Sequence, residues 1–302
     1  MSIKTTTINY FQIVPKDADL NTCKSVQEKL RGLENKKFKM MELSGKSFTI
    51  PDPLKKSDTY QLGTIFEIQM GNIPPSMNKN TLKVDPLKLE DTDGLAKATC
   101  FLLDVQANIL VIESNAGVSA HSLCQYFRFN SDLPRIVPAI IINPDLIQQF
   151  YKMGSLFSFE AKMAKINDGS LFSEGENSSI DQILQSADET DTDKLTYKLE
   201  IGPENKRENK SLNKEKILNF TKRLLQYKGT EEVESLKVSG RVGIEEKITT
   251  LELIKQRLND QIEYEIEDRL ITKYNLEDRY AQIEGKYAKH REYLLRTYKI
   301  ES

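Results

Sequence analysis

The sequence predicts an α+β protein built from three successive parts. Residues 1–170 predict a strand-rich mixed domain, because residues 3–14 alternate between polar and apolar side chains and several later runs are short and apolar. Residues 171–193 contain seven acidic residues and no Lys or Arg, a composition typical of a solvated acidic linker. Residues 194–302 predict a smaller αβ domain that ends in a long amphipathic helix.

The first part combines strands with a few short helices. Its first strand is expected over residues 3–14, and a helix follows that begins at Asn21 or Thr22 and ends before Gly32. Further strands are expected over residues 37–50, 62–70, 96–104, 108–113, 136–142 and 155–166. Further helices are expected over residues 117–127 and 143–151, the second with Asn143 as its cap and Pro144 at its first position.

The part after the acidic segment alternates strands with helices. Strands are expected over residues 195–201, 233–242 and 261–267, and helices over residues 211–227, 251–258 and 275–299. The last helix has an apolar stripe from Leu276 to Tyr298 with spacings of three and four residues, which is close to a heptad pattern. Because such a stripe needs a surface to cover it, we expect self-association or a protein partner at this helix.

Composition excludes several classes of protein. The 302 residues carry 43 Lys and Arg against 45 Asp and Glu, with two His and no Trp. Cys23, Cys100 and Cys124 are odd in number and widely separated, which argues against a disulfide framework and against a structural zinc site. The N-terminus lacks a secretory signal, and the most apolar run, residues 136–142, is too short to cross a bilayer, so a cytoplasmic protein is expected.

One enzyme hypothesis remains open after the scarcity of His and Cys is taken into account. Glu160 and Lys162 are two residues apart on a predicted strand and therefore share a face, and Asp145, Asp104 or Glu113 could add a second acid. Carboxylates can hold Mg²⁺ or Mn²⁺ while a lysine orients the attacking water, so these residues suggest a divalent-metal nuclease as one hypothesis. The alternative is an ion pair on a solvated sheet face, and no other cofactor is predicted.

A strand, a loop of small residues and a helix succeed one another over residues 109–127. Backbone N–H groups around Ser114, Gly117 and Ser119 could bind an anion at the start of that helix. No glycine-rich nucleotide motif accompanies them, and simple helix capping explains the same residues.

Two basic stretches are candidates for nucleic-acid binding. Residues 206–228 include Lys222 and Arg223, and the last helix includes Lys286 and Arg291 beside several tyrosines. The overall net charge of −2 favours the alternative that both stretches are solvated helix faces.

Four runs of residues together resemble those of a family of uncharacterised bacterial proteins of about this length: residues 63–69, 90–95, 108–119 and 289–294. The resemblance implies a setting among mobile-element and phage-defence genes, and it assigns no catalytic residue. The leading hypothesis is therefore a non-enzymatic binding or sensing module that contacts protein or nucleic acid, with the nuclease as the alternative.

Overall fold

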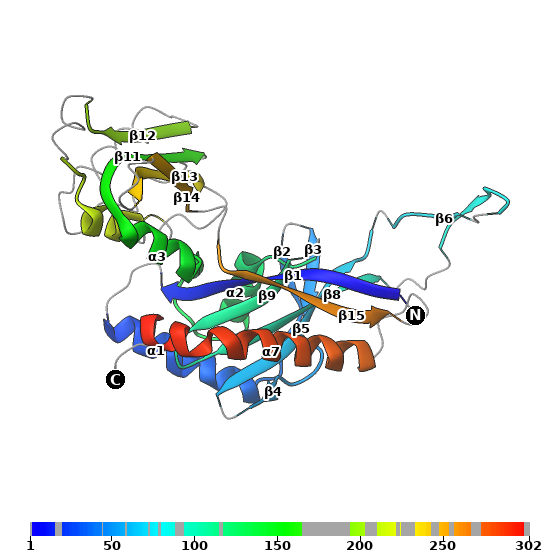
Figure 1. Cartoon of the computed structure of the whole chain (residues 1–302). Coiled ribbons are helices and arrows are strands. Elements are labelled where there is room, and N and C mark those ends of the chain that lie inside the picture. Colours follow the sequence, from blue (N-terminus) through cyan, green and yellow to red (C-terminus); the bar gives the residue numbers. More distant parts are fainter. Residues whose placement is uncertain are drawn as a thin grey trace. The chain divides into compact units, whose positions relative to one another are not determined.

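The structure is a computed structural model that describes residues 2–15, 20–43, 45–57, 59–71, 73–77, 80–87, 94–114, 117–164, 194–202, 210–221, 224, 233–242, 248–253, 257–266 and 273–298. Strands and helices both contribute, which confirms the α+β class (Figure 1). The chain divides into two compact units: unit 1 comprises Met1–Ile136 and Asp260–Ser302, and unit 2 comprises Val137–Asn259.

These units do not coincide with the division expected from the sequence. The last strand and the last helix belong to unit 1, although they follow unit 2 in the chain. The physical reason is sheet pairing, since β15 (Asn259–Ile266) hydrogen-bonds to β1 (Ser2–Pro15) at the other end of the sequence. The acidic segment 171–193 lies outside the described residues.

Unit 1 is built on a large sheet in which β1, β9, β8, β5, β3 and β2 are successive antiparallel neighbours. Its strand order is β1-β9-β8-β5-β3-β2, with β15 on β1 and β4 on β5. The remaining bounds are β2 (Met41–Leu43), β3 (Lys46–Thr49), β4 (Lys55–Lys56), β5 (Tyr60–Gln69), β8 (Leu95–Asp104) and β9 (Ile109–Ser114). The hairpin expected between residues 96–104 and 108–113 is confirmed as β8 and β9, and Asn108 has a positive φ of 52° in the turn.

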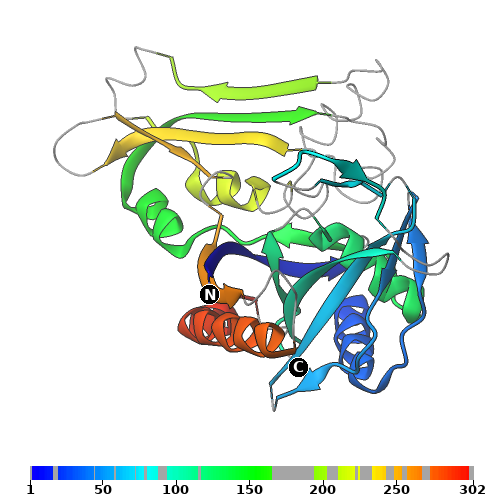
Figure 2. The same ribbon diagram turned by 90° about the vertical axis from the view of Figure 1, so that its right-hand side faces the viewer.

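Three helices cover the two faces of this sheet. Figure 2 shows α7 (Lys273–Tyr298) on one side and α1 (Leu20–Arg31) and α2 (Ala120–Asn130) on the other. Strand β8 contacts both layers because its side chains alternate: the ring of Phe101 meets Phe127 of α2, whereas Asp104 meets α7. A short 3-10 helix, η1 (Gly32–Asn35), follows α1.

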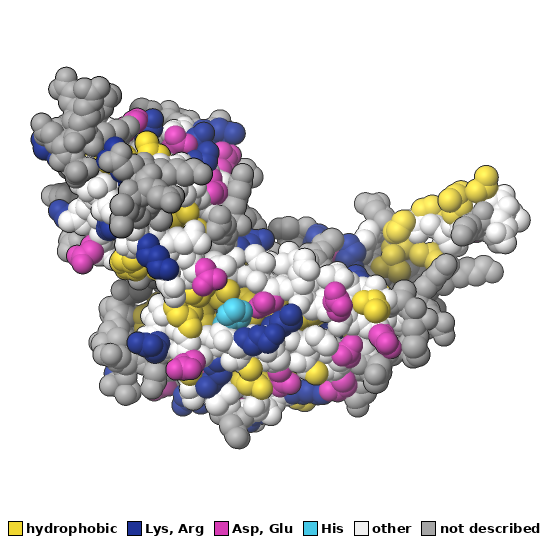
Figure 3. Space-filling view, viewed as in Figure 1, with side chains coloured by type: hydrophobic (Ala, Val, Ile, Leu, Met, Phe, Trp, Pro, Cys, Tyr) yellow, Lys and Arg dark blue, Asp and Glu magenta, His cyan; other side chains and the backbone are white. Residues whose placement is uncertain are grey.

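A two-stranded arm interrupts the hairpin of β5 and β8. It contains β6 (Ser76–Met77) and β7 (Val84–Asp85), and it exposes several large apolar side chains that appear yellow on the arm in Figure 3. These exposed residues are Met70, Met77, Leu82, Val84 and Leu87. No strand is expected from the sequence between residues 70 and 96, so β6 and β7 are additional elements.

Unit 2 contains a four-stranded antiparallel sheet with the order β12-β11-β13-β14. The bounds are β11 (Met153–Ala164), β12 (Lys194–Glu200), β13 (Val233–Val242) and β14 (Ile248–Glu252); β10 (Ile136–Ile140) and α3 (Pro144–Lys152) precede them. Residues 214–221 are helical, and Phe220 packs on Phe159 and Tyr197 of one sheet face. The opposite face carries polar and charged side chains.

Two expected elements differ from the structure. A helix over residues 251–258 is wrong, because Leu251 pairs with Val238 in β14 and Glu252 accepts a hydrogen bond from the backbone N–H of Leu236. A continuous strand over residues 37–50 is also wrong: residues 36–40 form no regular element, and β2 and β3 are separated by a turn in which Gly45 has a φ of 75°.

Candidate functional site

Glu160 and Lys162 share a face of β11, as predicted, and form an ion pair with 3.5 Å between Oε1 and Nζ. The strand register places Lys198 of β12 and Lys237 of β13 opposite Glu160. Lys198 in turn donates to Glu200, and this hydrogen bond raises the pKa of Lys198 above its ordinary value. The carboxylate of Glu160 therefore has Lys162 as its ion-pair partner and two further lysines at the opposing strand positions, and this positive charge disfavours a divalent cation.

Asp145 takes part in the capping of α3 rather than in a metal centre. Its backbone N–H donates to Oδ1 of Asn143 at 2.9 Å, so Asn143 caps the helix as expected. Within the described ranges, no three His, Cys, Asp or Glu side chains gather closely enough to hold a metal ion. The carboxylate and lysine hypothesis thus gains no geometric support from this part of the chain.

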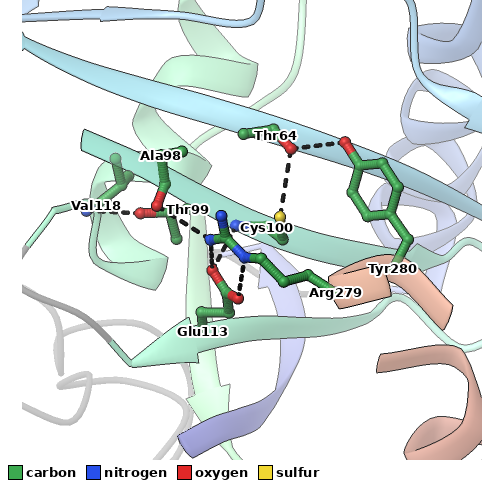
Figure 4. A network of polar contacts seen from close by, with 8 residues as sticks. All are labelled: Thr64, Ala98, Thr99, Cys100, Glu113, Val118, Arg279 and Tyr280. Atoms are coloured by element: carbon green, nitrogen blue, oxygen red, sulfur yellow. Dashed lines mark hydrogen bonds and ion pairs between the residues drawn. The ribbon is translucent and has the colours of Figure 1, made fainter. Parts of the chain in front are cut away.

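Glu113 lies in a buried polar network between the sheet and α7 (Figure 4). Its Oε1 accepts a hydrogen bond from Nε of Arg279 at 2.8 Å, and its Oε2 accepts from Nη2 of Arg279 and from the backbone N–H of Cys100. Arg279 also donates to the backbone oxygen of Ala98 at 3.2 Å and lies over the ring of Tyr264. Both carboxylate oxygens already have protein donors, so Glu113 fits a structural ion pair.

Asp104 is fully buried at the other end of the same interface. It accepts hydrogen bonds from the hydroxyl of Tyr287 at 2.6 Å, from Nε of Arg291 at 3.2 Å and from the backbone N–H of Gln106 at 2.8 Å. Burial, followed by the nearby Asp104, raises the pKa of Tyr287. Arg291, a predicted nucleic-acid contact, is therefore paired with a buried acid of its own unit.

The loop predicted to bind an anion has a helix-capping arrangement. The side chain of Ser119 accepts a hydrogen bond from the backbone N–H of Ser122 at 3.1 Å, so the start of α2 is capped by the chain itself. The backbone N–H of Val118 donates to the hydroxyl of Thr99 at 3.3 Å. Ser114 ends β9 and is exposed, and Gly117 has a partner within the fold.

The other predicted nucleic-acid contacts have different surroundings. Lys286 lines a cavity of about 690 Å³ together with Glu263, Glu265 and Asp278, where the local charge is negative. Figure 3 likewise shows Lys and Arg mixed with Asp and Glu on this face. Lys222 and Arg223 lie outside the described residues.

The near-heptad stripe of α7 is covered by its own unit. Ile283, Tyr287 and Leu294 are buried, and the helix contacts β8 and β9. Because the sheet already covers this face, the stripe does not need a second copy of the chain, and self-association through it is not proposed.

A different basic surface lies on the opposite side of the unit 1 sheet, and we call it the lysine–phenylalanine surface. It consists of Lys36, Lys37, Phe38, Lys39 and Phe129. Two grooves of about 580 and 220 Å³ share the first two lysines; Phe38 lines the larger groove and Phe129 the smaller. Phe129 is 56% exposed, so its ring is accessible to a ligand or partner.

This surface is held in place by the end of α2. The buried Oδ1 of Asn130 accepts a hydrogen bond from the backbone N–H of Lys39 at 2.6 Å, and its Nδ2 donates to the backbone oxygen of Lys39 at 3.3 Å. Phe38 stacks on Tyr126 with ring centroids 5.8 Å apart. The segment 36–40 has no strand of its own, yet these contacts fix its position.

Sequence reasoning missed this surface because residues 37–50 were assigned to a strand. The run Lys36-Lys37-Phe38-Lys39 was the available signal, since basic residues beside an aromatic residue are typical of nucleic-acid contacts. The contribution of Phe129 could not be read from the sequence, because it lies in the last turn of α2 and meets the lysines only in the folded chain.

The fold and its surfaces define an α+β protein of two units in which a basic, aromatic surface belongs to unit 1. The chain belongs to the family of unknown function DUF6731, whose model matches residues 1–294. No curated protein matches the chain. Among the described helices, none has the length and apolar character needed to cross a membrane.

Proposed function

We propose that this protein is a non-enzymatic module that binds nucleic acid on the lysine–phenylalanine surface of unit 1. The observation that carries the proposal is the pair of grooves that share Lys36 and Lys37. Lysines that line a groove can neutralise successive phosphates and release counterions, which is the main source of sequence-independent affinity for nucleic acid.

The balance of charge around the two grooves favours a polyanion. The basic side chains that line them or bond to their residues are Lys29, Lys36, Lys37, Lys39 and Lys56. The acidic ones are Glu34, Asp52 and Asp132. Glu34 is already neutralised by Lys56, with 3.0 Å between the charged atoms, so the remaining lysines are in excess.

Other surfaces support the proposal less well. The cavity beside Lys286 is lined by carboxylates, and Arg291 is paired with Asp104. The nuclease alternative would need converging acids, and in the described part of unit 2 Glu160 has Lys162 as its neighbour instead. No observation therefore favours it over binding.

The proposal includes a setting in the bacterial cytoplasm and in defence against phage. This setting rests only on the resemblance stated above, and it is independent of the surface. Plating a panel of phages on cells with and without the gene tests it, and equal plating for the whole panel contradicts it.

Fluorescence anisotropy with labelled DNA and RNA oligonucleotides over a range of NaCl concentrations tests the binding surface. Replacing Lys36, Lys37 and Lys39 together by Gln should lower affinity and reduce the slope of log K against log salt by about 2 to 3, since each lost phosphate contact contributes about 0.7 to 0.9. Affinity should fall at least about tenfold at low salt.

A matched control removes the same charge elsewhere. Lys194, Lys198 and Lys289 are exposed and distant in sequence, and their joint replacement by Gln should leave the salt slope unchanged. Equal losses in both triple variants would show a general charge effect and contradict the surface assignment. Variants at Lys222 and Arg223 belong in the same assay because they carry the competing prediction.

A further inference from the structure

The aromatic residues of the lysine–phenylalanine surface indicate which form of nucleic acid it takes. Phe129 is 56% exposed and Phe38 is half-buried, and each lines a groove that also contains Lys36 and Lys37. Base faces are hidden within a duplex, whereas in a single strand they are free to stack on aromatic side chains.

The larger groove has a rigid aromatic platform. One face of Phe38 stacks on Tyr126 at an interplanar angle of 28°. The hydroxyl of Tyr126 accepts a hydrogen bond from the backbone N–H of Ile50 at 3.0 Å, which fixes the ring. A preformed platform loses little conformational entropy when a base stacks beside it.

The smaller groove combines the exposed ring with a fixed backbone. Phe129 is the penultimate residue of α2 and precedes the buried Asn130, whose side chain hydrogen-bonds to both the backbone N–H and the backbone oxygen of Lys39. A single-stranded nucleic acid that runs from one groove to the other passes over Lys36 and Lys37, which line both grooves. Phosphate contacts thus lie between two stacking positions.

We propose that this surface selects single-stranded nucleic acid over duplex, with bases stacked on Phe129 and beside Phe38 and the intervening phosphates bound by Lys36 and Lys37. The inference rests on the proposed function and specifies its ligand. Single-strand channels that combine a basic groove with stacking aromatics tolerate many sequences, so pyrimidine oligomers are suitable probes.

The absence of Trp from the sequence allows a direct reporter of stacking. In full-length Phe129→Trp protein the only indole lies at the proposed stacking position, and a single-stranded oligo-dT or oligo-U should quench its fluorescence. A blunt duplex of equal length should cause little quenching. The matched control is Tyr151→Trp, another exposed aromatic position that lies in unit 2, whose fluorescence should not respond.

Affinity measurements give a second readout on protein without a reporter. Phe129→Ala should weaken single-strand binding about 5- to 150-fold, which corresponds to the stacking free energy of one base, while the salt slope stays unchanged. Phe129→Leu should lose nearly as much, because it keeps apolar area but not a ring. Duplex affinity should change less than about twofold.

The outcomes separate this inference from the proposed function. Wild-type binding of duplex as tight as that of single strands, or unchanged single-strand affinity in Phe129→Ala, overturns the inference and leaves nucleic-acid binding in place. Failure of wild-type protein to bind any oligonucleotide at low salt overturns both.

Discussion

The ion pair of Arg279 and Glu113 shows how much of the interface between α7 and the sheet depends on single residues. Both side chains are almost completely buried, with exposed fractions of 3% and 0%, and the pair is bidentate. A buried charge is tolerated only when its partner remains, because the isolated ion has lost its hydration. Arg279 therefore stabilises the fold. From the sequence alone it would be assigned to the solvated face of the last helix.

Replacing Arg279 by Met should destabilise the protein by about 3 to 5 kcal/mol, because Glu113 is left as an uncompensated buried charge. The second substitution Glu113→Gln should recover part of this loss, since the neutral amide still offers an oxygen to the backbone N–H of Cys100. Urea denaturation followed by circular dichroism measures both changes.

Arg296→Met is the control for this pair, because Arg296 is exposed on the same helix. Its effect should stay within about 0.5 kcal/mol. If Arg279→Met costs no more than Arg296→Met, the ion pair does not stabilise the interface.

At the scale of elements, α7 illustrates what periodicity can and cannot establish. The helix and its apolar stripe are confirmed, but in the first turns the buried positions are Asn275 and Arg279 rather than Leu276 and Tyr280. The polar side chains are buried because Glu265 and Glu113 supply partners from distant strands. A ranking by apolarity cannot identify such positions, since their partners come from tertiary structure.

Strands were predictable where neighbours along the chain pair with each other. The β8 and β9 hairpin follows directly from two apolar runs, and β1, β5 and α2 also form near their expected limits. The predicted helix over residues 251–258 is wrong because Glu252 accepts hydrogen bonds from the neighbouring strand, from Ser235 and from the backbone N–H of Leu236. These tertiary contacts stabilise a strand despite the local helical periodicity. The candidate site was missed for a similar reason, since Lys36 and Phe129 meet only through folding.

Alkaline pH should weaken the interface between α7 and the sheet. Burial raises the pKa of Tyr280 to about 12, and burial also raises the pKa values of Tyr287 and Tyr10. In the unfolded chain the pKa of a tyrosine is about 10. The contribution of these protonated tyrosines to the free energy of unfolding is therefore complete below about pH 10 and is lost as the pH rises toward about 12. Absorbance at 295 nm should show these tyrosines ionising together with the loss of helical circular dichroism.

Tyr280→Phe removes one hydroxyl whose pKa is raised by burial, so it should shift the alkaline unfolding transition to higher pH. Tyr151→Phe changes an exposed residue and should not shift the transition. Ionisation of every tyrosine near pH 10 with the fold intact would contradict the buried placement of Tyr10, Tyr280 and Tyr287.

At the scale of the whole molecule, unit 2 is an insertion into unit 1. The two segments that connect it are bonded to each other: Ile142 and Arg257 form a bridge, and the backbone N–H of Leu258 donates to the oxygen of Ile141 at 2.7 Å. Sequence order alone suggested consecutive domains, because nothing in residues 260–302 signals that they pair with a strand at the N-terminus. The division matters for function, since the whole lysine–phenylalanine surface belongs to unit 1.

A shortened chain tests both the division and the location of the site. Residues 1–142 joined to residues 257–302 through a short Gly-Ser linker keep the bridge and all of unit 1. This protein should fold and should bind single-stranded oligonucleotides within about twofold of the full chain, because distant sites contribute independently. A chain that ends at residue 259 lacks β15 and α7, so one sheet face is uncovered and it should aggregate.

Circular dichroism, light scattering and anisotropy on the two shortened chains decide between the possibilities. A folded unit 1 that has lost binding would move the site to unit 2, where Lys222 and Arg223 lie. A folded, monomeric chain ending at residue 259 would show that α7 is dispensable for unit 1. It would contradict the assignment of residues 260–302 to that unit. Retained binding by the joined chain, together with its loss after replacement of Lys36, Lys37 and Lys39 in that chain, would locate the nucleic-acid surface within unit 1 alone.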